Sequence, residues 1–292
     1  KPDTSFIGIF LNVSPDYLID MTITSLVENT SCKALPVEHG LSLHIRLDDG
    51  RSVLFDMGQK QLFADNAARL NINLSEVDLA IVSHGHYDHG GGLQTFLEIN
   101  GKANIYLNSH AFEPHYSLRM NGLAYIGLDH DLKDNCRLVF CEGETLLDNG
   151  LVLFSNVRGN HLKPTGNKLL FGPTKEQNDD FCHEQNLIIK ENDRTVLFAG
   201  CAHSGILNII QKAEEIAGGS LTHVFAGMHL VKSGLSEAEE TTFILSLADR
   251  LLENHHCQYF TMHCTGLPQY EILKKRMGNS INYLSCGDCV RI

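Results

Sequence analysis

The stretch SHGHYDHGGG, residues 83–92, directly follows VDLAIV, an apolar run typical of a buried strand. Residues two apart on an extended segment point to the same side, so His84 and His86 can present their imidazoles to one metal ion. Asp88 and His89 follow where the chain turns into a glycine-rich helix start, and they can serve a second ion. Two ions about 3.5–4 Å apart stabilise the attacking and the leaving oxygen of a hydrolytic displacement. The stretch therefore predicts a two-metal site at the end of a strand.

The composition is that of a globular protein with a surplus of histidine. The 292 residues are 43% hydrophobic and 20% charged, which excludes a disordered, collagenous or coiled-coil chain. The 16 His residues fit a metal protein, because imidazole is the commonest metal ligand. The net charge of -12 argues against broad phosphate neutralisation, so we expect no nucleic-acid partner. An anionic substrate would be met locally, by a metal or a few cationic groups.

Cysteine usage and the apolar runs bear on location and domain organisation. Nine Cys at scattered spacings favour reduced thiols and a cytoplasmic protein. No apolar run approaches the roughly 20 residues that cross a bilayer, so we expect no membrane partner. Residues 1–20 precede Met21 and carry no secretory signal pattern, so we interpret them as a leader or extension of unclear status. We expect a single domain over residues 21–292.

Hydrophobic periodicity predicts alternating strands and helices. Residues 41–47 and 52–55 flank a DDG turn signal and are typical of a hairpin. Helical spacing recurs at residues 62–70, 206–216 and 236–251. Further strands are predicted at residues 105–107, 138–140, 151–154, 187–189, 196–199, 221–226 and 259–262. Residues 158–180, rich in Gly, Pro, Asn and Asp, are expected to be a long functional loop. Two sheets with outer helices form the most economical architecture.

The pattern H-x-H-x-D-H after a strand resembles the second motif of the metallo-β-lactamase superfamily, and the resemblance runs from about Met21 to the C-terminus. It implies an α/β fold in the form of a four-layer αββα sandwich. Asp56, in the triplet DMG at the end of a predicted strand, resembles the first motif, whose Asp orients the ligands by hydrogen bonding. His263, which also follows a predicted strand, resembles the last metal-binding histidine.

A narrower resemblance rests on six motifs in the same order. They are EHGLSL at 38–43, LFD at 54–56, SHGHYDH at 83–89, AGCAHSGI at 199–206, GMHL at 227–230 and HCTG at 263–266. Together they resemble a subfamily that includes the 7,8-dihydropterin-6-methyl-4-(β-D-ribofuranosyl)aminobenzene-5'-phosphate synthases of methanopterin biosynthesis. This subfamily also has members of unassigned substrate, so the substrate does not follow from the motifs.

The resemblance implies a set of metal ligands with one open position. The expected ligands are His84, His86, Asp88, His89, His203 and His263. Superfamily hydrolases usually have a bridging Asp at the strand end where this chain has Cys201. Either the Cys201 thiolate ligates, which favours zinc over manganese, or His203 two residues later fills the vacancy. A third interpretation makes Cys201 a small buried residue with no ligand role.

Two further neighbourhoods carry weaker expectations. The segment before the predicted strand at 187–189 is where many superfamily members have a third histidine. Glu184 is the matching acidic position of the subfamily, and His183 is a candidate extra ligand or a support for the ligands. His229, in the GMHL motif, resembles a histidine that faces the cavity, and we expect it to act in catalysis or substrate contact alongside Asp88.

We therefore predict a metal-dependent hydrolase with two Zn2+ ions per chain, Mn2+ or Fe2+ being the alternatives. A metal-bound hydroxide would attack a small ester, lactone, thioester or phosphate ester, and Asp88 or a nearby histidine would move the proton. A reaction like that of the dihydropterin-phosphate synthases is a narrower version of this prediction. The alternative is a catalytically weak metal protein that binds or senses a small molecule, which Cys201 suggests. The resemblance also makes a homodimer an expectation.

Two other activities of the superfamily are excluded by particular features. Oxygen-reducing diiron members carry a Glu where this chain has His86, so the resemblance gives no expectation of that activity. RNA-processing members need a basic substrate face, which a net charge of -12 argues against.

Overall fold

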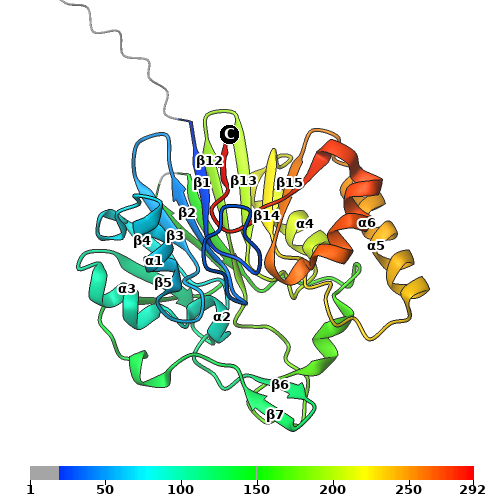
Figure 1. Ribbon diagram of the computed structural model, residues 1–292, viewed down its shortest axis with the longest axis horizontal. Helices are drawn as coiled ribbons and strands as arrows, with labels where there is room; N and C mark the ends of the chain where they lie inside the picture. Colours follow the sequence, from blue (N-terminus) through cyan, green and yellow to red (C-terminus); the bar gives the residue numbers. More distant parts are fainter. Residues whose placement is uncertain (1–19, 149) are drawn as a thin grey trace, which may run out of the picture.

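Two mixed seven-stranded β-sheets lie face to face at the centre of the computed structural model, which describes residues 20–148 and 150–292 (Figure 1). The leader expected at residues 1–20 therefore lies outside the described residues, except for Asp20. In spatial order the first sheet comprises β17 (Cys289–Arg291), β1 (Thr22–Val27), β2 (Ser42–Arg46), β3 (Ser52–Phe55), β4 (Leu79–Ile81), β5 (Asn104–Asn108) and β8 (Leu138–Cys141). The second comprises β16 (Ile281–Tyr283), β15 (Gln258–Thr261), β14 (His223–Ala226), β13 (Arg194–Ala199), β12 (Gln185–Glu191), β10 (Leu151–Ser155) and β9 (Glu144–Asp148).

Helices cover the outer face of each sheet. They are α1 (Leu62–Arg69), α2 (Tyr87–Gly90) and α3 (Leu93–Ile99) on the side of the first sheet, and α4 (Ile206–Ala217), α5 (Glu237–Leu251) and α6 (Leu267–Met277) on the side of the second. Short 3-10 helices are η1 (Leu74–Glu76), η2 (His130–Leu132), η3 (Thr165–Leu169), η4 (His263–Thr265) and η5 (Gly278–Ser280). No helix in residues 20–148 or 150–292 combines the length and the apolar character that a membrane span requires.

Three apolar cores separate the four layers. Phe55 and Phe198 meet between the two sheets. Phe63 of α1 packs in a second core against the outer face of the first sheet. Ile209 of α4 and Ile244 of α5 pack in a third core against the outer face of the second sheet. All five side chains are fully buried. The predicted αββα sandwich is thereby confirmed, and its helices follow the predicted periodicity.

Parallel strands bring the sequence motifs to one edge of the sandwich. In the first sheet β3 pairs in parallel with β4, so that Asp56 and Ser83 follow neighbouring strand ends. In the second sheet β13, β14 and β15 are parallel and in register at Ala199, Ala226 and Thr261. Because the carboxyl ends of parallel strands share an edge, the residues that follow these strands converge there.

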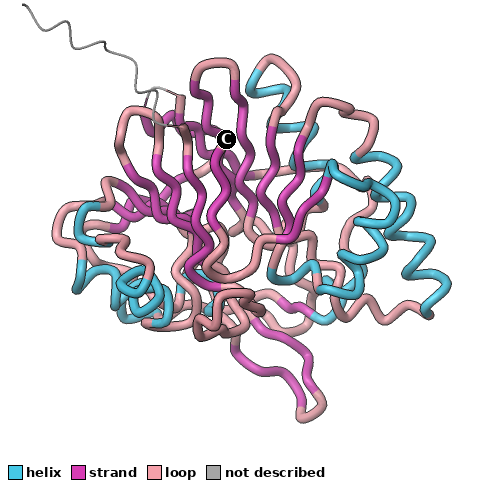
Figure 2. Tube along the Cα trace, turned by 45° about the horizontal axis from the view of Figure 1, so that its top comes forward, coloured by secondary structure: helices cyan, strands magenta, loops and turns pink. Residues whose placement is uncertain are grey.

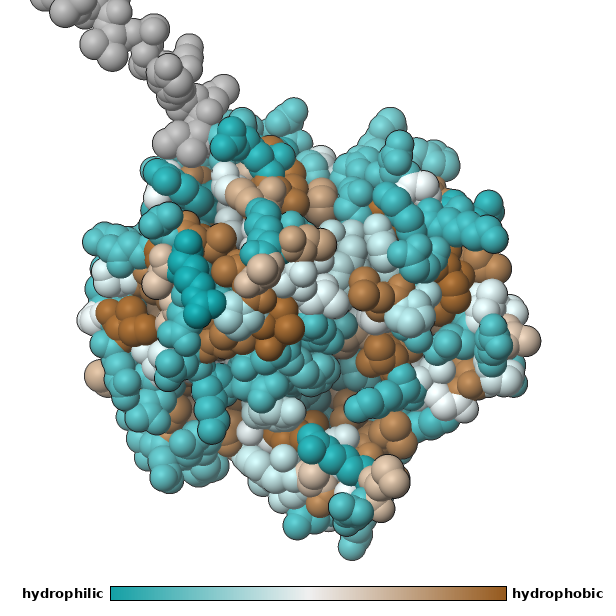
Figure 3. All heavy atoms as spheres, in the orientation of Figure 1, coloured by the Kyte–Doolittle hydropathy of each residue, from teal (hydrophilic) through white to brown (hydrophobic). Residues whose placement is uncertain are grey.

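The segment at residues 158–180 is mostly irregular, as its composition predicts, but it is not without secondary structure. It contains η3 and the short strand β11 (Leu170–Phe171), which pairs with β6 (Tyr116–Arg119) beside β7 (Gly122–Tyr125). The β6–β7 hairpin projects from the body of the molecule (Figure 2), and its tip mixes hydrophobic with hydrophilic residues (Figure 3). The hairpin is missing from the predictions, although Asn121, the second residue of its two-residue loop, and Gly122, the first residue of β7, form a turn-favouring pair.

A buried carboxylate joins the two ends of the described chain beside this edge. Glu28, which follows β1 and is fully buried, accepts hydrogen bonds from the backbone N–H of His263 (2.7 Å) and the hydroxyl of Tyr283 (2.7 Å). Its other oxygen accepts the backbone N–H and the hydroxyl of Thr30 at 2.6 and 2.7 Å. Glu28 thus fixes the backbone of His263 relative to the first sheet.

Replacing Glu28 with Ala should destabilise the protein, because the variant leaves buried donors without an acceptor. We expect the free energy of unfolding to fall by about 3 kcal/mol or more, since each unsatisfied buried donor costs about 1–3 kcal/mol. Glu144→Ala, which removes an exposed carboxylate from β9, is the matched control and should stay within about 0.5 kcal/mol of the unchanged protein. Urea unfolding of the three proteins measures this, and equal stabilities would contradict the role given to Glu28.

Candidate metal centre

Three buried histidines from two segments converge at the edge of the sandwich. His84 and His86 follow β4, and His203 lies in the turn between β13 and α4. His84 Nε2 and His86 Nδ1 are 3.0 Å apart, and the three side chains offer ligand atoms within 4.8 Å of one another. His203 Nε2 is buried and has no hydrogen-bond partner. Two facing ring nitrogens and one unpartnered nitrogen are what a group of metal ligands provides, so this first triad fits a metal ion.

The electrostatics of the first triad keep its rings neutral. Burial, followed by repulsion from neighbouring histidines, lowers the pKa of His84, His86 and His203 well below the ordinary value. A neutral imidazole keeps the lone pair that coordinates a metal. The triad is therefore ready to ligate at neutral pH.

A second triad, formed by Asp88, His89 and His263, lies beside the first. Asp88 Oδ2 is 3.4 Å from His263 Nε2 and 4.0 Å from His89 Nε2, and the two ring nitrogens are 3.2 Å apart. His39 Nε2 is 3.2 Å from the same oxygen of Asp88. Burial alone would raise the pKa of Asp88, but hydrogen bonds from His263 and His39 and the charges of nearby histidines hold it well below its usual range. Asp88 is therefore a carboxylate at neutral pH.

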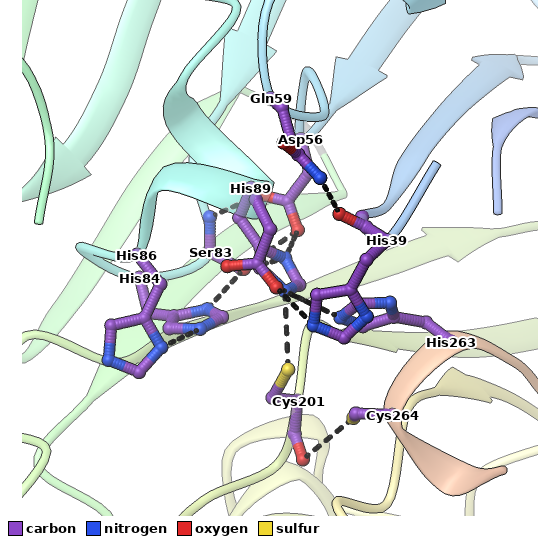
Figure 4. Close-up of polar contacts among 12 residues, drawn as sticks. His39, Asp56, Gln59, Ser83, His84, His86, His89, Cys201, His263 and Cys264 are labelled. Atoms are coloured by element: carbon purple, nitrogen blue, oxygen red, sulfur yellow. Dashed lines mark hydrogen bonds and ion pairs between the residues drawn. The ribbon is translucent and has the colours of Figure 1, made fainter. Parts of the chain in front are cut away.

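Asp56 supports the motif through hydrogen bonds to Ser83 and His89, which Figure 4 shows. One oxygen accepts the backbone N–H of Ser83 at 2.7 Å, and the other accepts the Ser83 hydroxyl at 2.8 Å and His89 Nδ1–H at 2.6 Å. Burial lowers the pKa of His89, but the Asp56 carboxylate outweighs it and raises the pKa to about 9. His89 must therefore release a proton before its Nε2 can bind a metal at neutral pH.

The same support recurs at other ligands. His84 Nδ1 lies 2.9 Å from the Ser83 hydroxyl oxygen, His203 Nδ1 lies 3.0 Å from Asn167 Oδ1, and His263 Nδ1 lies 3.0 Å from Asn29 Oδ1. When a metal ion binds, each ring can donate its Nδ1–H to this oxygen and keep the Nε2 lone pair for the ion. Such partners fix the tautomer and the ring orientation of metal-binding histidines.

Cys201 lies between the two triads. Its Sγ is 3.2 Å from His89 Nε2, and it shares one group of ligand atoms with His84 and His89 and another with His263 and Cys264. Burial and the adjacent Cys264 raise the pKa of the Cys201 thiol well above its usual value, so metal binding has to displace its proton. Of the two alternatives for the open position, the structure puts Cys201 at the intermediate position and His203 in the first triad.

Two of the predicted site residues, Glu184 and His183, belong to neither triad and bind neighbouring backbone groups instead. Glu184 accepts the backbone N–H groups of His203 (2.6 Å) and Ser204 (2.9 Å), so it shapes the turn that carries His203. His183 Nδ1 accepts the backbone N–H of Gly85 at 2.9 Å, and its Nε2 lies 3.3 Å from Asp179 Oδ2. Both nitrogens of His183 are engaged, so it contributes to neither triad.

A cleft of about 390 Å³ opens onto the two triads. His86, Asp88, His203 and His263 line it together with His229. Burial lowers the pKa of His229 to about 4, and its Nδ1 is buried without a partner. The predicted position of His229 on the cavity wall therefore agrees with the geometry, while its role in catalysis stays a prediction.

Sequence reasoning missed several residues of the site. His39 was available, because it lies in the EHGLSL motif, but the spacing gave no reason to bring it to Asp88. Asn167 and Asp179 lie in the predicted functional loop at residues 158–180, but nothing in its composition singles them out, and Asn29 and His115 lie in segments without a recognisable pattern.

Comparisons with known proteins agree with this geometry. Residues 35–206 match the family model of the metallo-beta-lactamase superfamily. The crystal structure of Tm1679, described as a metal-dependent hydrolase of the beta-lactamase superfamily, is 30% identical with a TM-score of 0.76, over 93% of this chain and 99% of that one.

Two relatives come from Methanocaldococcus jannaschii. The uncharacterized protein MJ0448 is 29% identical over 84% of this chain and 90% of its own length. The 7,8-dihydropterin-6-methyl-4-(beta-D-ribofuranosyl)-aminobenzene-5'-phosphate synthase is 25% identical over 87% of this chain and 90% of its own, which makes it a distant homologue. With the motif, the fold and the match over more than half of its length, this chain belongs to the metallo-β-lactamase superfamily.

Proposed function

We propose that this protein is a metal-dependent hydrolase that holds two ions per chain. The observation that carries the proposal is the pair of adjacent buried triads with Cys201 Sγ between them, at the floor of a cleft. Metal ions bound there would lower the pKa of coordinated water and polarise a substrate oxygen. The superfamily membership and the resemblance to Tm1679 support the same activity.

The residues of the chain have distinct roles in this proposal. Asp88, whose Oδ2 lies 3.2 Å from His39 Nε2 and 3.4 Å from His263 Nε2, would ligate a bound ion, and Asp88 or a nearby histidine would accept the proton of the attacking water. His229, neutral because its pKa is about 4, contacts the substrate from the cleft wall. Asp56 and Asn29 keep their histidines oriented and take no part in the reaction itself.

Zinc is the native metal in this proposal. Histidines, Asp88 and the thiols of Cys201 and Cys264 surround the centre, and nitrogen and sulfur ligands suit Zn2+ better than Mn2+ or Mg2+. The deciding ligand is Cys201, because its soft sulfur occupies the intermediate position.

The charges of the cleft favour an anionic substrate among the esters, lactones, thioesters and phosphate esters that fit this chemistry. Besides the residues of the two triads and their neighbours, Arg119 and Lys232 line the cleft. Within the described part of the chain neither has a carboxylate within 4.0 Å. In a protein of net charge -12, two cleft cations that no described carboxylate neutralises support a phosphate ester as the substrate.

The alternative candidate is a catalytically weak metal protein that binds or senses a small molecule. Cys201 supports it, because its sulfur occupies the intermediate position where superfamily hydrolases usually have a bridging Asp. The two candidates differ in what a ligand substitution does: an enzyme loses rate, whereas a binder changes only its affinity.

Replacing His86 with Ala tests the metal centre. The unchanged protein, purified without chelator, should hold about two ions per chain, and the variant should hold fewer and hydrolyse reporter esters at least about 100-fold more slowly. Plasma emission spectrometry and a screen with phosphate, lactone and thioester reporters measure both quantities. His256→Ala, which removes an exposed histidine away from the cleft, is the control. Less than about half an ion per chain in the unchanged protein, with no activity restored by zinc or manganese, would rule out the proposal.

Replacing Cys201 with Ser tests the sulfur ligand. Loaded with Co2+, the unchanged protein should show thiolate-to-cobalt charge-transfer absorption, and Cys201→Ser should lose it because a hydroxyl gives no such transition. Cys257→Ser changes another buried cysteine, beside Tyr259, and should leave the band in place. A band that survives in Cys201→Ser would place the thiolate elsewhere and return Cys201 to the role of a small buried residue.

The two cleft cations can be tested with a matched pair of substrates. Arg119→Ala and Lys232→Ala should each raise the KM for 4-nitrophenyl phosphate about tenfold, because a charge-assisted hydrogen bond contributes about 1.5–3 kcal/mol. The KM for neutral 4-nitrophenyl acetate should stay unchanged. Lys102→Ala, whose ammonium is paired with Asp78, serves as the control. Equal effects on both esters would show that the cations do not select an anionic substrate.

A further inference from the structure

One ligand of the first triad lacks the support that the others have. His84, His89, His203 and His263 each have Nδ1 within hydrogen-bond distance of an oxygen and turn Nε2 toward the centre. His86 is reversed: its Nδ1 faces His84 Nε2 at 3.0 Å, and its Nε2 is buried without a hydrogen-bond partner. With a metal on Nδ1, Nε2 carries the proton. The fold therefore leaves one buried N–H donor of the metal centre without an acceptor.

A second cluster of buried side chains lies beside this nitrogen. Asp179 Oδ2 is 2.9 Å from His115 Nδ1 and 3.3 Å from His183 Nε2. The side chains of His115, His183 and Asp179 are 1%, 0% and 3% exposed. Together with His86 they form a group whose ligand atoms all lie within 4.8 Å of one another. The cluster is therefore both buried and adjacent to the metal centre.

The protons of this cluster can be assigned from its partners. His183 Nδ1 accepts the backbone N–H of Gly85, so its proton is on Nε2 and goes to Asp179. His115 donates Nδ1–H to the same carboxylate, which leaves its Nε2 as an acceptor. That Nε2 is buried and unpartnered. The ring of His115 lies edge-on to His86, with centroids 5.6 Å apart and planes at 75°. The unpartnered donor of His86 thus has an unpartnered acceptor next to it.

The glycine between the first two ligands shows how tightly the cluster packs on the motif. A Cβ at Gly85 would lie 2.3 Å from the backbone oxygen of Ala111 and 2.8 Å from His115 Nε2. No side chain fits between the cluster and the backbone that carries His86. His115 Nε2 therefore faces the motif itself.

We propose that Asp179 and His115 are positioning residues that hold His86 through a carboxylate–imidazole–imidazole chain, in which His115 accepts the Nε2–H of His86 directly or through one water. The inference rests on the metal binding proposed above. Asp179 fixes the tautomer of His115, His115 orients the ring of His86, and His86 is committed to ligate through Nδ1. Supports of this kind typically change metal affinity about 10–100-fold.

Neighbouring carboxylates give a matched test. Asp179→Asn should weaken zinc binding about 10–100-fold in competition with a chelator. Asp180→Asn makes the same change of charge one residue away, where the carboxylate accepts the backbone N–H of Cys182, and should change affinity less than about twofold. His115→Phe should weaken binding as Asp179→Asn does, whereas His115→Gln, which retains an acceptor at the end of its side chain, should recover part of the loss.

A spectroscopic readout separates positioning from loss of structure. In the zinc-loaded, 15N-histidine-labelled protein the Nε2–H proton of His86 should be shifted downfield and exchange slowly, and in His115→Phe it should exchange faster. If Asp179→Asn does not fold, this measurement and the two His115 variants decide the question.

Three outcomes would overturn the inference. The first is that Asp179→Asn binds zinc within about twofold of the affinity of the unchanged protein. The second is that the Nε2–H proton of His86 exchanges rapidly in the unchanged protein. The third is an additional ion per chain that His115→Phe removes, because the cluster would then itself be a metal site. An unchanged protein that binds no zinc would instead end the proposed function, and this inference with it.

Discussion

The buried carboxylate of Asp56 is the constraint on which the metal centre depends. It receives the backbone N–H and the hydroxyl of Ser83 and the ring N–H of His89, so it joins the end of β3 to the start of the motif after β4. A charge in this buried position needs donors, and Asp56 receives three. These hydrogen bonds align the motif, and the alignment turns His84 Nε2 toward His86 and His89 Nε2 toward His263.

The other half of the centre comes from the second sheet and depends on the register of its parallel strands. The parallel register of β13, β14 and β15 delivers Cys201, His229 and His263 to one edge. Buried carboxylates then fix the backbone that carries the ligands. Glu184 accepts the backbone N–H of His203, and Glu28 accepts that of His263. Each sheet thus brings part of the ligand set, and neither sheet alone holds a complete triad.

Sequence patterns anticipated the elements that have strong local signals. The helix at 206–216 and the strand at 196–199 were predicted because their apolar residues recur at the spacing of one buried face. The hairpin of β6 and β7 and the terminal strand β17 were missed. β17 has only three residues and forms by pairing with β1 at the other end of the described chain, and no local pattern reveals such a pairing. The two-residue strand β11 within residues 158–180 was also missed, because it acquires its strand conformation only from pairing with β6.

For the centre, the local spacing H-x-H-x-D-H after a strand is enough to identify side chains that can bind metal. The residue after another predicted strand likewise shows that Cys201 stands where superfamily hydrolases usually have a bridging Asp. The packing of the two sheets, by contrast, places the sulfur between the triads, brings His203 to His84 and His86, and puts His115 and Asp179 beside His86. Those relations join segments tens of residues apart, and their geometry follows from how two sheets pack, a property that local spacing does not contain.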